Sequence, residues 1–95
     1  MNTNKKVQVI DKDQIQFLTF PKTEVLDKKN DQINRFLDLK RGLILGNLEH
    51  EKVKILFEDD SGLKRVETTI WALTDKSVIL KKATIIPLER ILGVA

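Results

Sequence analysis

Apolar and polar residues alternate along the chain from about residue 52 onward. The segment 52–58, with sequence KVKILFE, places Val53, Ile55 and Phe57 on one face, and segment 63–73 alternates again. Alternation with a period of two residues is typical of a strand with one buried face. These two segments therefore predict neighbouring antiparallel strands.

The turn between these strands, DDSG at 59–62, predicts how they pair. Gly62 is the residue that tolerates a positive φ at little cost, so the turn favours Glu58 opposite Leu63. The pairs that follow are Ile55 with Val66, Val53 with Thr68, and Lys54 with Glu67. A slip of one residue would lose all three pairs, so this register is strongly specified.

Further turns follow at short intervals. The turn TDKS at 74–77 predicts Leu73 opposite Val78 and Trp71 opposite Leu80. The remaining segments are a turn at 81–83, a strand at 84–87, a 3₁₀ turn at 88–90 and a last strand at 91–95. Turns at this spacing predict a meandering sheet or a small barrel over residues 52–95.

A helical pattern occupies residues 24–41. Thr23 is the expected N-cap, Arg41 lies in the last turn, and Gly42 is the expected terminator. The predicted apolar stripe consists of Leu26, Ile33, Phe36 and Leu37. A break at Asn30-Asp31, with the helix restricted to 31–41, is the alternative. Residues 43–45 are expected to form a short strand or an extended run, followed by a turn at 46–47.

The segment before this helix predicts two short strands, at 7–10 and 14–20, and Pro21 ends the second. Residues 1–6 are polar and expected to fray. Whether 7–20 joins the same sheet or a second copy of the chain is left open. The expected fold is a single α+β domain, 1–95, with an N-terminal helical region packed on a strongly bent antiparallel sheet or small barrel.

Two resemblances bear on this fold. The order of parts from 52 to 94, with IPLERI at 86–91 leading into a closing strand, resembles small barrels of the Src-homology-3-like and Sm-like kind. Such a resemblance implies a fold and carries no function by itself. The segments LGN, KVKILFED, VETTIWALT and IPLERI, within residues 31–95, resemble a small family of uncharacterised bacterial proteins, and no activity transfers from it.

Composition excludes several classes of protein. The chain has no cysteine, so it forms neither a disulfide nor a cysteine-ligated metal site, which fits a reducing compartment. It has no apolar run of transmembrane length and no apolar segment after its N-terminal lysines that would make a secretory signal. A cytoplasmic protein without a membrane partner is the expectation.

The net charge and the distribution of basic residues do not decide whether the partner is a nucleic acid or a protein. The net charge is +3, from 17 basic and 14 acidic residues, and the basic residues form separate pairs rather than one stripe. The basic residues that we consider as contacts for nucleic acid or another partner are Arg41, Lys64, Arg65, Lys81, Lys82 and Arg90. The alternative is a set of ordinary solvated side chains.

No constellation of residues predicts catalysis. His50 is the single histidine, and its neighbours Glu49 and Glu51 would point to other faces of an extended chain, so a metal-dependent enzyme is set aside. The acidic run 58–60 fits a polar hairpin tip better than a cation site. No glycine-rich phosphate loop and no activated nucleophile are found. We therefore expect no enzyme, no metal, no cofactor and no small-molecule substrate.

Trp71 is the single tryptophan, and its role separates two functions. The predicted pairing places it among Leu73, Val78 and Leu80, which favours a core position over an exposed aromatic platform. The favoured function is a non-enzymatic interaction module with a protein partner or a second copy of the chain. The alternative is a small barrel that binds RNA or single-stranded DNA, for which Trp71 and the basic pairs would supply the contacts.

Overall fold

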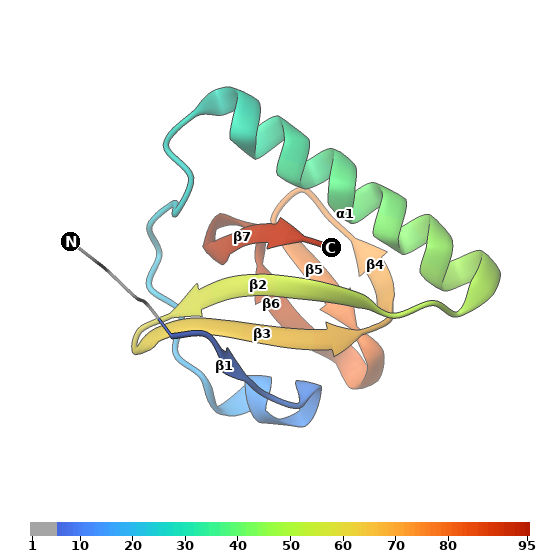
Figure 1. The fold of residues 1–95 in the computed structure, drawn as a ribbon, viewed down its shortest axis with the longest axis horizontal. Helices are drawn as coiled ribbons and strands as arrows, with labels where there is room; N and C mark the ends of the chain where they lie inside the picture. The colour runs from blue at the N-terminus through green and yellow to red at the C-terminus, as the bar shows by residue number, and fades with distance from the viewer. Residues whose placement is uncertain (1–5) are drawn as a thin grey trace.

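The structure, a computed structural model, describes residues 6–95 (Figure 1). It contains one α-helix, three short 3₁₀ helices and seven strands in the described residues. Their order is β1 (Gln8–Val9), η1 (Lys12–Phe17), α1 (Lys29–Glu49), β2 (Val53–Asp59), β3 (Gly62–Thr68), β4 (Ile70–Leu73), β5 (Ser77–Leu80), η2 (Lys81–Ala83), β6 (Thr84–Pro87), η3 (Leu88–Arg90) and β7 (Ile91–Val94). The fold is α+β, as the sequence predicts.

The strands form two sheets. One has the order β1-β3-β2-β7 and the other the order β4-β5-β6. Thr69 separates β3 from β4, so the long strand predicted over 63–73 passes from the first sheet to the second. Within the described residues the two sheets do not join into a closed barrel. The likeness to a small barrel therefore remains a prediction.

The register of the β2–β3 hairpin confirms the predicted pairing. The pairs are Ile55 with Val66, Val53 with Thr68, Lys54 with Glu67, and Glu58 with Leu63. The side chain of Asp59 holds the turn, because its Oδ1 accepts hydrogen bonds from the backbone N–H groups of Ser61 at 3.0 Å and Gly62 at 3.1 Å. Gly62 has a φ of 141°, a conformation that side chains with a Cβ rarely adopt.

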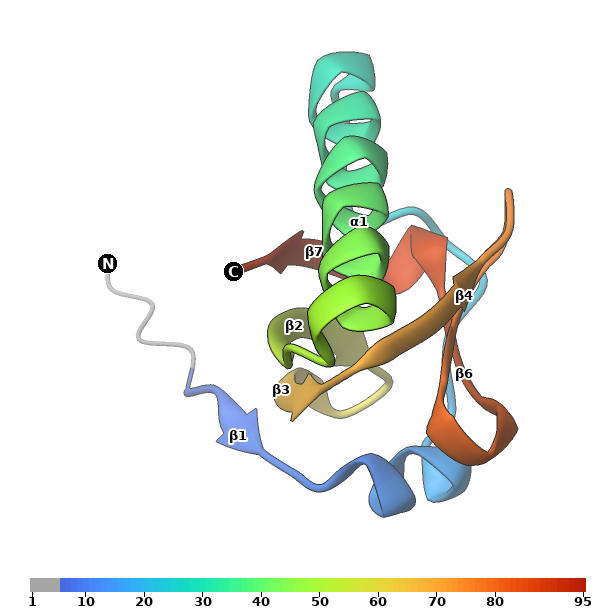
Figure 2. The same ribbon diagram turned by 90° about the vertical axis from the view of Figure 1, so that its right-hand side faces the viewer.

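Helix α1 lies along one side of the strands, and β1 and η1 lie on the opposite side (Figures 1 and 2). The predicted bounds 24–41 are wrong, because the helix begins at Lys29 and continues to Glu49. Gly42 does not terminate it, and both the short strand or extended run predicted at 43–45 and the turn predicted at 46–47 are helical. The physical reason is packing: both glycines of this segment, Gly42 and Gly46, are buried against the strands, where their missing side chains allow a close approach.

The predicted apolar stripe of the helix is also wrong. The residues of α1 that are buried are Arg35, Leu39, Gly42 and Gly46. Ile33 and Leu37 are half exposed on the other side, Leu26 precedes the helix, and Phe36 packs at the edge of the core. Thr23 caps no helix, because α1 starts six residues later.

The segment before α1 differs from the prediction as well. The strand predicted at 7–10 is reduced to β1, which pairs in parallel with β3 of the same chain, so the larger sheet is mixed. The strand predicted at 14–20 is wrong, because 12–17 forms η1, whose Ile15 is buried in the core. Residues 1–5, most of the predicted frayed tail at 1–6, lie outside the described residues.

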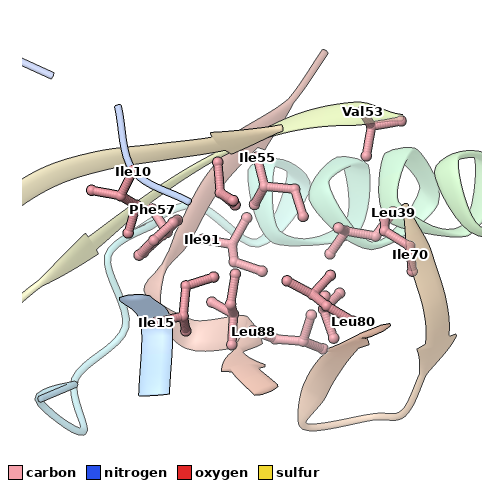
Figure 3. Close-up of a cluster of buried hydrophobic side chains, with 13 residues drawn as sticks. Ile10, Ile15, Leu39, Val53, Ile55, Phe57, Ile70, Leu80, Leu88 and Ile91 are labelled. Atoms are coloured by element: carbon pink, nitrogen blue, oxygen red, sulfur yellow. The ribbon is translucent and has the colours of Figure 1, made fainter. Parts of the chain in front are cut away.

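One hydrophobic core connects the two sheets, α1 and η1 (Figure 3). Ile55 and Phe57 enter it from β2, and Ile70 and Leu80 enter it from the second sheet. Ile15 and Leu39 close it from η1 and α1. Fully burying an aliphatic side chain of this size contributes about 1.5–3 kcal/mol each, so this cluster is the main source of stability.

Candidate interaction surfaces

Lys64 does not lie on the surface. Its ammonium Nζ is buried 2.9 Å from Oδ1 of Asp59 and donates a second hydrogen bond to Ser61 Oγ at 2.9 Å. Burial of the carboxyl would raise the pKa of Asp59, but the hydrogen bonds from Lys64 and Ser61 outweigh burial and hold that pKa below its ordinary value. Lys64 therefore completes the hairpin turn, and we remove it from the set of contacts for a partner.

Arg90 is buried too, and its role is to join distant segments. Its Nε donates to the carbonyl oxygen of Glu58 at 3.0 Å, and its Nη1 donates to the carbonyl oxygen and the hydroxyl of Thr23 at 2.8 and 2.9 Å. All three hydrogen bonds join the guanidinium to oxygen atoms of the same chain. The guanidinium thus fixes the segment before α1 to the end of β2, and it is not free to meet a phosphate.

Arg35 makes a similar connection from the inner face of α1. Its guanidinium donates to both carboxylate oxygens of Glu24, at 2.6 and 2.8 Å, and to the carbonyl oxygen of Ile91 at 3.0 Å. The hydrogen bond from Arg35 holds the pKa of Glu24 below its ordinary value. Arg35 is not among the candidates predicted from the sequence, because an arginine on a predicted helix carries no sign of which face it occupies.

The other four basic candidates are exposed. Arg65 lies on β3, Lys81 and Lys82 lie in η2, and Arg41 lies on α1, where its Nη1 is 3.0 Å from Oδ1 of Asp38. They occupy three different elements. The structure therefore keeps Arg41, Arg65, Lys81 and Lys82 as surface cations without gathering all of them at one place.

Trp71 is exposed, so the core position favoured by the sequence is wrong. The predicted pair Leu73–Val78 is present, but Leu80 faces Ile70 instead of Trp71. The register shifts between Ile70 and Ala72, which makes Trp71 the extra residue of a β-bulge. Bulges change the direction of a side chain, and here 56% of Trp71 is exposed while Ile70 takes the core position.

Trp71 borders a surface hollow of about 600 Å³. The other residues that line it come from the end of α1, from the junction of the two sheets and from η2: Gly46, Asn47, His50, Thr69 and Lys81. The lining thus offers an aromatic face, one ammonium and several hydrogen-bonding groups. Among the described residues, it contains no carboxylate. These are the features that suit a planar, anionic ligand.

His50 ends α1 in the left-handed conformation, with φ 56° and ψ 29°. Its backbone N–H donates to the carbonyl oxygen of Gly46 at 3.0 Å, which satisfies an unpaired carbonyl group of the last turn. The side chain is exposed. Within residues 6–95, no three His, Asp or Glu side chains come together in a way that would hold a metal ion.

The outer face of α1 carries a second surface, which we call the α1 stripe: Ile33, Leu37, Ile44 and Leu48. Successive helical residues advance by about 100°, so the four side chains fall within an arc of about 60° on the side opposite Leu39 and Gly42. Leu48 is 76% exposed and Ile44 is 54% exposed. Helix α1 is therefore apolar on two opposite faces, and the sheets cover one of them.

A shallow hollow of about 260 Å³ adjoins the first half of the α1 stripe. Ile33, Phe36 and Leu37 form its apolar lining, with Lys29 and Gln32 at its rim. The α1 stripe therefore has relief: a depression near its N-terminal end and the protruding Leu48 near its C-terminal end. Ile33 and Leu37 belong to the apolar stripe predicted from the sequence, but they lie on the exposed face of α1 and not on its core side.

Comparisons of the chain with protein family models, with curated proteins and with solved structures found no match. None of the helices in the described part of the chain combines the length and the apolar character that a bilayer crossing requires.

Proposed function

We propose that this protein is a non-enzymatic interaction module that binds a helix of a protein partner, or of a second copy of the chain, through the α1 stripe. The observation that carries the proposal is the position of Ile33, Leu37, Ile44 and Leu48 on the face of α1 that no strand covers. Surface helices of globular proteins usually present polar residues on that face. Apolar residues that recur at helical spacing on an exposed face are typical of a surface that docks another helix.

The energetics support this choice of surface. Each of the four side chains leaves apolar area in water, and covering apolar area contributes about 25 cal/mol per Å². The positions recur at intervals of four and seven residues, which is the spacing of anchor residues in a helix that lies against another helix. Lys40 and Arg41 interrupt the stripe near its middle and keep this face soluble in the free protein.

A photo-crosslinking amino acid placed at Ile44 tests the proposal. We expect ultraviolet light to join residue 44 to one defined protein segment in an extract of the cells that make the protein, and peptide mass spectrometry would identify that segment. Ile85 on β6 is the matched control, because it is an isoleucine with 50% exposure, against 54% for Ile44, and lies away from α1. Absence of an adduct at 44, or the same adducts at 44 and 85, would overturn the proposal.

Binding of single-stranded nucleic acid is a second candidate function, which one observation favours. Trp71 is exposed on the same hollow as Lys81, so an unpaired base could stack on the indole while a phosphate meets the ammonium. Burial of Lys64 and Arg90 removes two of the cations on which this candidate was based.

Amide NMR spectra of labelled protein, titrated with short RNA and single-stranded DNA at low and moderate salt, test this second candidate. We expect shifts around Trp71 and Lys81 that diminish as salt rises, because phosphate contacts release counterions. Trp71→Ala and Lys81→Glu should weaken them, and Arg65→Glu, on another element, is the control. Undetectable or salt-independent binding would remove this candidate.

A further inference from the structure

We infer that the occupant of the α1 stripe is a second copy of this chain, whose α1 packs antiparallel across a two-fold axis beside the Lys40–Arg41 peptide bond. The inference rests on the proposed function and names the partner that this surface fits. Three observations carry it: the spacing of the stripe, its relief and the charges at the two ends of α1.

The spacing of the stripe is symmetric about one point. Ile33 and Leu48 are equally far from the Lys40–Arg41 bond, and so are Leu37 and Ile44. Two antiparallel copies centred there bring Ile33 of one copy opposite Leu48 of the other, and Leu37 opposite Ile44. Every apolar residue of the stripe then meets an apolar residue, which is the self-complementarity that a two-fold interface requires.

The relief of the stripe matches the same arrangement. The hollow lined by Ile33, Phe36 and Leu37 lies in the N-terminal half of α1, and Leu48 protrudes in the C-terminal half. In the antiparallel pair, Leu48 of each copy enters the hollow of the other, in the manner of a knob in a hole. Each of the two hollows therefore receives one leucine, which comes from the other copy.

A parallel pair would fit less well. It would set Leu48 against Leu48 and leave both hollows empty, and it would bring Lys28 and Lys29 of the two copies together. The antiparallel pair instead sets these lysines of the two copies far apart, each near the C-terminal end of the partner helix, where the helix dipole is negative and where Glu49, Glu51 and Lys52 lie. Charge and shape therefore favour the same orientation.

Lys40 gives the pair a distinctive response to salt and to mutation. The Lys40 side chains of the two copies meet near the two-fold axis, so their repulsion weakens association at low salt. We expect association to tighten as salt rises, the opposite of nucleic-acid binding. Lys40→Leu should tighten it by about tenfold or more, because it replaces a central charge with an apolar contact in each copy.

The absence of cysteine allows a direct test of orientation in the full chain. Purified Ile33→Cys and Leu48→Cys variants are mixed and oxidised gently, and the products are identified by mass spectrometry. We expect the mixed disulfide between residues 33 and 48 to dominate, because residue 33 is about 22 Å along the axis from its own copy in an antiparallel pair. Predominant 33–33 disulfides would overturn the antiparallel arrangement.

Sedimentation equilibrium over a wide concentration range completes the test. Ile44→Glu and Leu48→Glu should each weaken dimerisation by about 100-fold or more, since each buries two carboxylates in an apolar contact. Ile85→Glu, the matched control on β6, should leave it unchanged, and circular dichroism checks that each variant is folded. A strict monomer, or equal loss in Ile85→Glu, would overturn the inference.

These outcomes separate the inference from the proposed function. If photo-crosslinks from residue 44 lead to α1 of another copy, both are supported. If they lead to a different protein while the purified chain sediments as a monomer, the docking surface stands and the second copy is excluded. If residue 44 forms no adduct and the chain is a monomer, both fail.

Discussion

Gly46 of α1 lies directly against Thr69, at the junction of the two sheets: a Cβ on Gly46 would be 2.9 Å from Cγ2 of Thr69 and 3.0 Å from the carbonyl oxygen of Ile70. The second neighbour is backbone, which cannot move aside without shifting β4. The contact therefore sets how closely the helix approaches the sheets.

Gly46→Ala should lower the free energy of unfolding by about 1–2 kcal/mol, because the cost of overpacking exceeds the gain in helix propensity. Urea denaturation measures the change. Gly93→Ala is the control, since no atom lies within 4 Å of the position of its Cβ. A Gly46→Ala protein as stable as the original would show that α1 moves away easily.

Lys64→Ala should destabilise the protein by about 3–5 kcal/mol, because it leaves the buried carboxylate of Asp59 without its charge partner. Urea denaturation again measures the change. Arg65→Ala, one residue away and exposed, should stay within about 0.5 kcal/mol of the original protein. Equal effects of the two substitutions would contradict the role given to the buried ammonium. A charge reversal at Lys64 would therefore lower the stability of the fold, so a loss of ligand binding in that variant would not identify Lys64 as a ligand contact.

Acid should weaken the fold through Glu24 and Asp59. Both carboxyl groups have a pKa below the ordinary values of 4.5 and 3.8, so each stabilises the folded state when ionised. That contribution is present above the ordinary pKa and is lost as pH falls below it towards the lowered folded value. The urea midpoint should therefore drop between about pH 4.5 and more acidic conditions. In Glu24→Gln this drop should be smaller, and an unchanged profile would show that the Arg35 contact contributes nothing.

His50→Gly should raise the free energy of unfolding by about 0.5–1 kcal/mol, because glycine adopts the left-handed conformation of residue 50 without the strain of a Cβ. Thermal unfolding followed by circular dichroism measures the change. His50→Ala keeps the Cβ and serves as the control, so it should not stabilise the protein. A destabilised glycine variant would mean that the imidazole makes a stabilising contact.

The β2–β3 hairpin could be predicted from the sequence because each signal there is local. The alternation around Ile55 and the turn ending in Gly62 specify the same register, so nothing distant is needed. The C-terminal end of helix α1 was harder to predict than the hairpin. Gly42 ordinarily indicates a helix end, and the contacts of Gly42 and Gly46 with the strands override that preference.

Which residues lie on the surface was harder to predict from the sequence than the fold class. A helix that is apolar on two faces does not reveal which face meets the sheet, so the pattern predicts the wrong side for Ile33 and Leu37. The exposure of Trp71 depends on a one-residue bulge, which the alternation of apolar and polar residues cannot indicate. Arg90 looks like any surface arginine, because the oxygen atoms that it binds belong to Glu58 and Thr23, which are 32 and 67 positions away.

The order of strands in the larger sheet affects how the protein can be made. Strand β2 lies between β3 and β7, so it acquires its second neighbour only after residues 91–94 have been synthesised. Arg90, which anchors Thr23, emerges at almost the same time. A nascent chain therefore holds a formed hairpin with one open edge until synthesis passes β7, and it is most vulnerable to aggregation and proteolysis in that interval.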